Sequence, residues 1–224
     1  MAFNDFQGES PSNYEQKCTC VMVLDVSGSM KGEPIDKLNQ GLQDFYQDIQ
    51  GDLTTSNRLE LSIVTFGSKV DCLVEPSLAD NITLPTLIAD GSTKLVDGVR
   101  KGIEVALARK KWYNDTGQPY YRPWVILITD GEPDKNQDVD GLRREIEMGV
   151  QGKSFLFFAI GVEQANMEML NTISTKTMPP AKLAGLKFSE FFNWLSNSMD
   201  IITSSEEGQV VNLPNTTWTE GFTI

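Results

Sequence analysis

The chain has 224 residues and a mass of 24.9 kDa, a length that suits one large α/β domain with a sizeable core. Its 19 Lys and Arg against 31 Asp and Glu give a formal net charge of −12, which repels phosphate backbones and anionic membrane surfaces, so neither nucleic acid nor a membrane is expected as a partner. The sequence contains no histidine, which excludes Ser-His-Asp triads, Cys-His pairs and His-ligated zinc sites.

In chain order, the first expected element is a solidly apolar run at residues 20–24, typical of a central parallel strand buried on both faces. Apolar residues at helical spacing then fill residues 34–51. A second strand at 59–66 leads through a very short link into residues 69–74. Because a link this short cannot form a parallel crossover, the pair is predicted to be an antiparallel hairpin at the sheet edge.

A loop-like stretch up to Ser92 precedes a helix over residues 94–110, and a polar loop is expected over 114–123. The apolar run at 124–129 predicts a buried strand, which ends in a dense turn signal at 130–134. The remaining expected elements are a helix at 139–151, a strand at 154–160, a short helix at 167–173, a brief strand at 181–183 and a final helix through 188–199.

This alternation of buried strands and amphipathic helices predicts a doubly wound α/β fold: a mostly parallel six-stranded sheet with one antiparallel edge strand and helices on both faces. We expect one domain over residues 18–205, after a polar N-terminal segment 1–17 and before a polar tail 206–224. In such sheets ligands bind at the carboxyl ends of strands where the strand order reverses. Asp25 and Asp130 each follow a buried strand at such an end.

The three cysteines, Cys18, Cys20 and Cys72, cannot form a closed disulfide framework. The N-terminal segment lacks the basic start and apolar stretch of a secretory signal. The longest apolar run, residues 155–162, is far shorter than a membrane span. These features predict a reducing compartment and a cytoplasmic location.

Oxygen-bearing side chains gather around the two acidic turns. Asp25, Ser27 and Ser29 alternate along an extended exit from the first strand, so their oxygens can point toward one place. Asp130 offers a second carboxylate from a neighbouring strand, and Thr93 a third hydroxyl from a glycine-containing turn. Because Mg²⁺ prefers oxygen ligands and is usually held by one or two carboxylates, the sequence predicts a Mg²⁺ site here, with Mn²⁺ or Ca²⁺ as substitutes. Glu132 and Asp134 are interpreted as solvated loop charges.

These residues resemble a known pattern, the metal-ion-dependent adhesion site of the von Willebrand factor type A (VWA) domain. The matching stretches are Asp25-x-Ser27-x-Ser29, Gly91-x-Thr93 and Ile128-Thr129-Asp130-Gly131. The resemblance covers the whole expected domain. It implies that the three hydroxyls contact the metal directly, while the two carboxylates act directly or through water.

Further stretches look like the bacterial TerY-like branch of that family, which is linked to tellurium-resistance and stress gene clusters. They are LITDGEPD at 127–134, KFSEFFNWL at 187–195 and LPNTTW at 213–218. This similarity implies a signalling or stress role, with a kinase or phosphatase of the same gene cluster as a candidate partner.

The expected function is therefore a Mg²⁺-dependent interaction module, not an enzyme, in which the metal holds an Asp or Glu of a protein partner. One alternative is a metal-dependent hydrolase such as a phosphoesterase, whose general base would be Asp25, Asp130 or Glu132. Another is a scaffold with a vestigial metal site. Simpler roles also stay open, since Thr93 could cap the following helix and Asp130 could be a turn residue.

Overall fold

The computed structural model describes residues 13–130, 132–205 and 213–214. A six-stranded sheet runs through the centre in the order β3-β2-β1-β4-β5-β6, and only the edge strand β3 is antiparallel to its neighbour. The strands are β1 (Cys18–Asp25), β2 (Leu59–Phe66), β3 (Val70–Leu78), β4 (Trp124–Thr129), β5 (Leu156–Gly161) and β6 (Ala181–Lys182). The predicted doubly wound α/β fold, with a mostly parallel sheet and one antiparallel edge strand, is confirmed.

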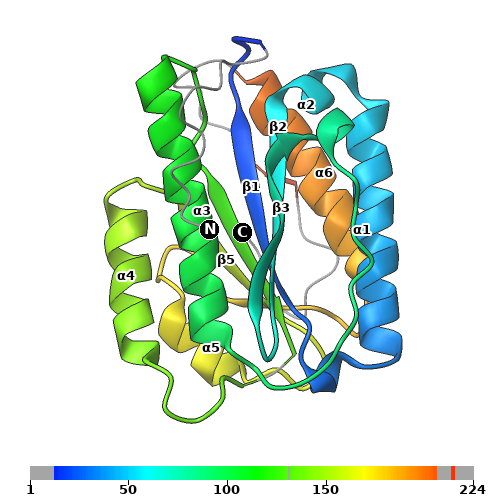
Figure 1. Cartoon of the computed structure of the whole chain (residues 1–224), viewed down its shortest axis with the longest axis vertical. Helices are drawn as coiled ribbons and strands as arrows, with labels where there is room; N and C mark the ends of the chain where they lie inside the picture. The colour runs from blue at the N-terminus through cyan, green and yellow to red at the C-terminus, as the bar shows by residue number, and fades with distance from the viewer. Residues whose placement is uncertain (1–12, 131, 206–212, 215–224) are drawn as a thin grey trace.

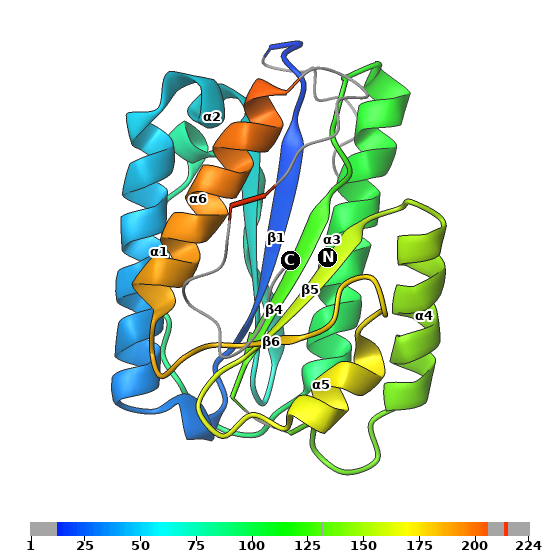
Figure 2. The ribbon, with the colours of Figure 1, turned by 180° about the vertical axis from the view of Figure 1, so that it is seen from behind.

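Helices cover both faces of this sheet (Figures 1 and 2). They are α1 (Glu33–Gly51), α2 (Leu53–Arg58), α3 (Leu95–Thr116), α4 (Val139–Gln151), α5 (Met167–Ile173) and α6 (Phe188–Ser204), with two short 3-10 turns, η1 (Gly28–Met30) and η2 (Ala79–Asn81). Helices α1 and α6 pack on one face, and α3, α4 and α5 on the other.

The side chains of β1 contribute alternately to two hydrophobic cores, one on each face of the sheet. Cys20 and Met22 belong to the core under α1 and α6, whereas Val21 and Val23 belong to the core under α3 to α5. Every residue of β1 is buried. Neighbouring side chains of a strand point to opposite faces, so a strand covered on both sides is apolar along most of its length, as the run at 20–24 indicated.

Two helical segments differ from the sequence prediction. The helix α3 continues beyond residue 110, where Trp112 and Tyr113 are buried, and its last turn enters the stretch 114–123 that was assigned to a loop. It ends where Gly117 takes the left-handed conformation with φ 71°. The helix α2 was not predicted. Asp52 begins it by accepting a hydrogen bond from the Thr55 amide at 2.7 Å.

Parts of both terminal segments contact the domain. Lys17 is buried and its backbone amide donates to the Pro119 carbonyl at 2.9 Å. Leu213 packs against the core under α1 and α6, and the Trp194 indole donates to the Pro214 carbonyl at 2.9 Å. The boundaries 18 and 205 stay predictions, since most of segments 1–17 and 206–224 lies outside the described residues.

A buried polar cluster joins the start of β2 to α3. The Arg109 guanidinium donates to both carboxylate oxygens of Glu60, at 2.7 and 2.6 Å, and the Tyr113 hydroxyl donates to Glu60 at 2.5 Å. The same guanidinium lies 3.9 Å from the centroid of the Trp112 ring. Because β1 and β2 are parallel, this cluster lies at the end of the sheet opposite to Asp25. It therefore belongs to the packing of the domain and not to the candidate metal site.

None of the helices in the described part of the chain is both long and apolar enough to cross a bilayer.

Candidate metal centre

The candidate site lies where the strand order reverses. The chain leaves β1 toward β2 on one side and reaches β4 on the other side only after the hairpin and α3. Asp25 is the last residue of β1, and Asp130 directly follows β4. These two carboxylates therefore come from adjacent parallel strands at the edge where such folds bind ligands.

Asp25 is completely buried at this edge. Its Oδ1 accepts from the Ser27 amide at 2.8 Å, and its Oδ2 accepts from the Thr129 hydroxyl at 2.5 Å. Burial raises the pKa of the Asp25 carboxyl, the hydrogen bonds from Ser27 and Thr129 lower it in part, and the nearby Asp130 raises it further. A cation at this place would compensate the cost of the buried charge.

Two serine hydroxyls connect the first turn to Asp130. The Oγ atoms of Ser27 and Ser29 are 3.0 Å apart, and Ser29 donates to Asp130 Oδ1 at 2.8 Å. Burial raises the pKa of Asp130 as well, while the bond from Ser29 lowers it in part. The structure thus brings four of the five candidate ligands into one connected group.

The turn that carries Thr93 contacts the turn after β1 through its backbone. The Gly28 amide donates to the Gly91 carbonyl at 3.0 Å. A Cβ at position 28 would lie 3.2 Å from that carbonyl oxygen, and Gly91 has φ +83°, so glycine at both positions permits the close approach of the two turns. In the described part of the chain no hydrogen bond engages the Thr93 hydroxyl, which leaves it available as a ligand.

Thr93 does not act as the cap of α3. Lys94 stands at the N-cap position without a side-chain cap, and the Val96 amide donates instead to Gln137 Oε1 at 2.8 Å. The loop after β4 also forms hydrogen bonds with the backbone of Thr93. The Thr93 amide donates to Asp134 Oδ2 at 3.1 Å, and its carbonyl accepts from the Asp134 amide at 3.1 Å.

Asp134, which the sequence suggested to be a solvated loop charge, therefore also holds the backbone of Thr93 through two hydrogen bonds. Glu132 is exposed but also engaged, since it accepts from the Asn166 side chain at 2.6 Å. Gln137 went unnoticed in the sequence because its partners lie about forty positions away, beyond the reach of any local pattern.

The donor set has a definite chemistry. Two carboxylates and three hydroxyls offer only oxygen, which suits a hard cation such as Mg²⁺. Among the described residues, no three side chains of His, Cys, Asp and Glu form a group that could hold a metal, so the hydroxyls are essential to this set. The residues present fit a magnesium site.

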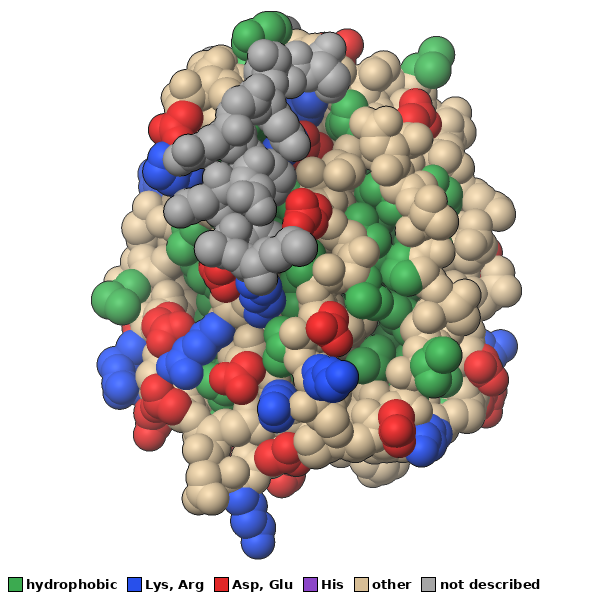
Figure 3. All heavy atoms as spheres, in the orientation of Figure 1, with side chains coloured by type: hydrophobic (Ala, Val, Ile, Leu, Met, Phe, Trp, Pro, Cys, Tyr) green, Lys and Arg blue, Asp and Glu red, His purple; other side chains and the backbone are tan. Residues whose placement is uncertain are grey.

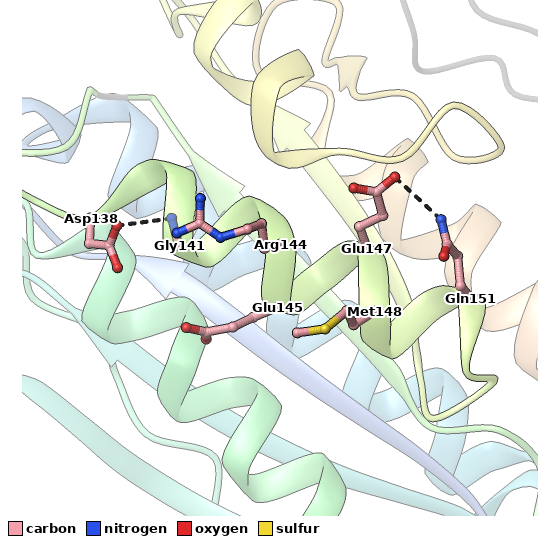
Figure 4. Close-up of a pocket in the computed structure, with 7 residues that line it drawn as sticks. All are labelled: Asp138, Gly141, Arg144, Glu145, Glu147, Met148 and Gln151. Carbon is pink, nitrogen blue, oxygen red and sulfur yellow. Dashed lines mark hydrogen bonds between the residues drawn. The ribbon is translucent and has the colours of Figure 1, made fainter.

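A pocket on α4 carries no comparable chemistry. It measures about 410 Å³ and is lined by Asp138, Gly141, Arg144, Glu145, Glu147, Met148 and Gln151 (Figure 4). It includes none of the five candidate ligands. Lysine, arginine, aspartate and glutamate side chains lie side by side over the lower part of α3 and α4 in Figure 3. Arg100 of α3 pairs with Glu145 at 2.8 Å and with Asp138 at 2.9 Å. We interpret this hollow as ordinary charged surface.

Comparison with known proteins gives a consistent picture. Residues 20–191 match the model of the von Willebrand factor type A domain family. A curated relative, inter-alpha-trypsin inhibitor heavy chain H1 of Mesocricetus auratus, is 26% identical over 146 residues, which are 61% of this chain and 15% of the relative.

Solved structures share the fold at low sequence identity. The pilus adhesin SpaC of Lactobacillus rhamnosus GG, in its open conformation, superposes with a TM-score of 0.65 at 14% identity, over 85% of this chain and 31% of the adhesin. The vWF domain of the type V pili tip protein Mfa5 of Porphyromonas gingivalis superposes with a TM-score of 0.57 at 11% identity, over 89% of this chain and 99% of that domain.

The chain thus spans less than a third of the curated relative and of the adhesin, but nearly all of the isolated pilus-tip domain. Its match to the family model extends from β1 to α6. Since that match covers well over half of the sequence and the sheet has the expected topology, this chain belongs to the von Willebrand factor type A domain family.

Proposed function

We propose that this VWA domain is a Mg²⁺-dependent protein-interaction module whose ion takes an Asp or Glu of a partner as a further ligand. The observation that carries the proposal is the connected group at the ends of β1 and β4, which joins two carboxylates and two serine hydroxyls. The turn that carries Thr93 contacts the same turn after β1 through its backbone. VWA domains typically serve in interaction or adhesion, which supports a binding role.

Charge explains why the ion would be needed. The two carboxylates balance the two charges of Mg²⁺, so the ion is held without a large excess of negative charge and can accept one more anionic ligand. A chain of net charge −12 would otherwise repel a partner's carboxylate. Only the divalent ion reverses the local sign, and the contact should therefore disappear when the ion is removed.

The first test is metal binding itself. We expect titration calorimetry of the metal-free protein with Mg²⁺ or Mn²⁺ to show one saturable site. A ligand specific for the folded state stabilises it by about 2.7 kcal/mol at 100 times its dissociation constant, so the melting temperature should rise with metal and fall again with chelator.

Asp130→Asn should weaken this binding, and Glu132→Gln is the matched control, because Glu132 lies on the same loop but bonds to Asn166. The absence of saturable heat at millimolar metal would refute the site.

The second test concerns the partner. Affinity capture with the purified chain should recover a protein in Mg²⁺ that is lost with chelator and with Asp130→Asn, but retained with Glu132→Gln. A partner that is captured equally in all four conditions would show that the metal does not bridge the two proteins.

A finer assignment rests on the sequence resemblance alone. We propose a role in a bacterial tellurium-resistance or stress system of the TerY-like kind, with a kinase or phosphatase as partner and a cytoplasmic location. The three free cysteines agree with a reducing compartment. Identification of the captured protein by mass spectrometry tests this assignment.

The geometry favours binding over hydrolysis. Each of the three carboxylates considered as a general base already has a role: Asp25 and Asp130 accept hydrogen bonds within the ligand group, and Glu132 bonds to Asn166. With no histidine in the sequence, we propose that the domain is not an enzyme.

A further inference from the structure

We infer that Gln137 is a positioning residue of this site: its side-chain amide holds Thr93 in place and thereby sets the affinity for the divalent ion. The inference rests on the proposed function. It deepens that proposal by naming a residue outside the ligand set that controls the strength of the metal bond.

Both ends of the Gln137 amide are engaged. Its Nε2 donates to the Thr93 carbonyl at 2.6 Å and to the Asp134 carbonyl at 3.3 Å. Its Oε1 accepts from the Val96 amide in the first turn of α3 at 2.8 Å. One side chain from the loop after β4 therefore fixes both the turn that carries Thr93 and the helix that follows it.

Thr93 needs such support because little else on its own segment holds it. It lies between Gly91, whose positive φ marks an irregular turn, and α3, whose N-cap residue Lys94 makes no side-chain cap. A metal ligand must be kept within about 0.5 Å of its working position for full affinity. Without the Gln137 bonds, the contacts from the loop after β4 to Thr93 would be reduced to those of Asp134, and Thr93 would be held less firmly relative to the serines and Asp130.

The support also connects two ligands of the ion. Gln137 belongs to the loop that begins with Asp130, so its bond to Thr93 ties the third hydroxyl to the second carboxylate. Asp134, on the same loop, adds two bonds to the Thr93 backbone. The far end of the loop is anchored independently, because Asp138 caps α4 through the Gly141 amide at 2.9 Å and pairs with Arg100. A change at Gln137 should therefore leave α4 in place.

The chemistry of the amide makes the role testable. Glutamate at position 137 would keep the acceptor for the Val96 amide but lose the donor for the Thr93 carbonyl. It would also add negative charge near the ion, which by charge alone should strengthen metal binding. Positioning and electrostatics thus predict opposite results for Gln137→Glu.

The experiment is Mn²⁺ titration calorimetry on the full chain, with melting temperatures in chelator as a measure of fold stability. We expect Gln137→Met to weaken Mn²⁺ binding about 10-fold, the lower end of what loss of a group supporting a metal ligand costs, and Gln137→Glu to weaken it too. Gln151→Met is the matched control. Gln151 is an exposed glutamine of α4, and among the described residues its side chain forms a hydrogen bond only with Glu147. The Gln151→Met variant should therefore bind Mn²⁺ with the affinity of the native chain.

The double variant with Thr93→Ala shows how Gln137 acts. If Gln137 works through the Thr93 hydroxyl, then Gln137→Met should weaken binding by less than about twofold once that hydroxyl is gone, because the two changes act on one bond. A purely structural role would instead lower affinity by the same factor in both backgrounds, and this result would overturn the inference.

The remaining outcomes are also decisive. Unchanged affinity in Gln137→Met, while Thr93→Ala weakens binding, would overturn the inference and leave the metal site intact. Stronger binding in Gln137→Glu would also overturn it, in favour of electrostatics. If Gln137→Met does not fold, Gln137→Glu decides in its place. A native chain that binds no Mn²⁺ would refute the proposed function itself.

Discussion

Asp25→Asn is expected to weaken Mg²⁺ or Mn²⁺ binding by about 100-fold while leaving the fold intact. Outer groups that merely support a ligand contribute about 10- to 100-fold to metal affinity, and Asp25 supplies one of only two carboxylates in the proposed set, so its effect should reach the upper limit or exceed it. Asparagine has nearly the same size and keeps an acceptor for the Ser27 amide, which protects the packing. Titration calorimetry measures the loss of affinity.

The same variant should be at least as stable as the native chain when metal is absent. Burial and the nearby Asp130 raise the pKa of Asp25 above its usual 3.8, so the folded state disfavours the ionised carboxylate. For an acid with a raised pKa in the folded state, stability is lost as the pH rises from the unfolded value through the folded one. In chelator the native chain should therefore lose stability relative to Asp25→Asn as the pH increases from about 4.

Thermal melts at several pH values, with and without metal, test whether the native chain loses stability relative to Asp25→Asn as the pH rises. Glu132→Gln should behave like the native chain in both states. If Asp25→Asn unfolds in chelator, or binds metal like the native chain, the assignment of Asp25 to the ion is wrong.

Arg109→Met is expected to lower the free energy of unfolding by about 3–5 kcal/mol, the usual cost of removing one partner of a buried ion pair. Glu60 is 3% exposed and receives two bonds from Arg109, so the variant would leave a buried carboxylate with the Tyr113 hydroxyl as its main remaining partner. Chemical denaturation followed by circular dichroism measures the change.

Two controls separate this effect from a simple loss of charge. The double variant with Glu60→Met removes both charges and should recover much of the stability, because well-packed apolar residues can replace a buried pair. Lys111→Met removes an exposed pair with Asp115 on the same helix and should cost less than about 1 kcal/mol. A cost for Arg109→Met as small as that for Lys111→Met would contradict the prediction. Metal affinity should not change, since the Glu60 cluster lies at the opposite end of the sheet.

Much of this architecture could be predicted from local sequence. Strands buried on both faces are mostly apolar, and the helices that cover them carry one apolar side, so β1, β2, β4, α1, α4 and α5 appear in the sequence close to their observed bounds. The short link after β2 was enough to predict the antiparallel hairpin. Asp25, Ser27 and Ser29 lie within five residues, and their alternation alone indicated that they share one side.

The sequence by itself thus determined the order of the elements, the fold class and the oxygen-rich character of the site, because these depend on periodicity and on residue type. Only the tertiary structure decided three features that depend on long-range contacts. They are the C-terminal end of α3, where buried Trp112 and Tyr113 extend the helix, the pairing of Glu60 with Arg109, and the hydrogen bond from Gln137 to Thr93. Such contacts join positions about forty to fifty residues apart. No local pattern specifies which distant side chain will meet a given amide or carboxylate, since that choice is made when the sheet and its helices pack together.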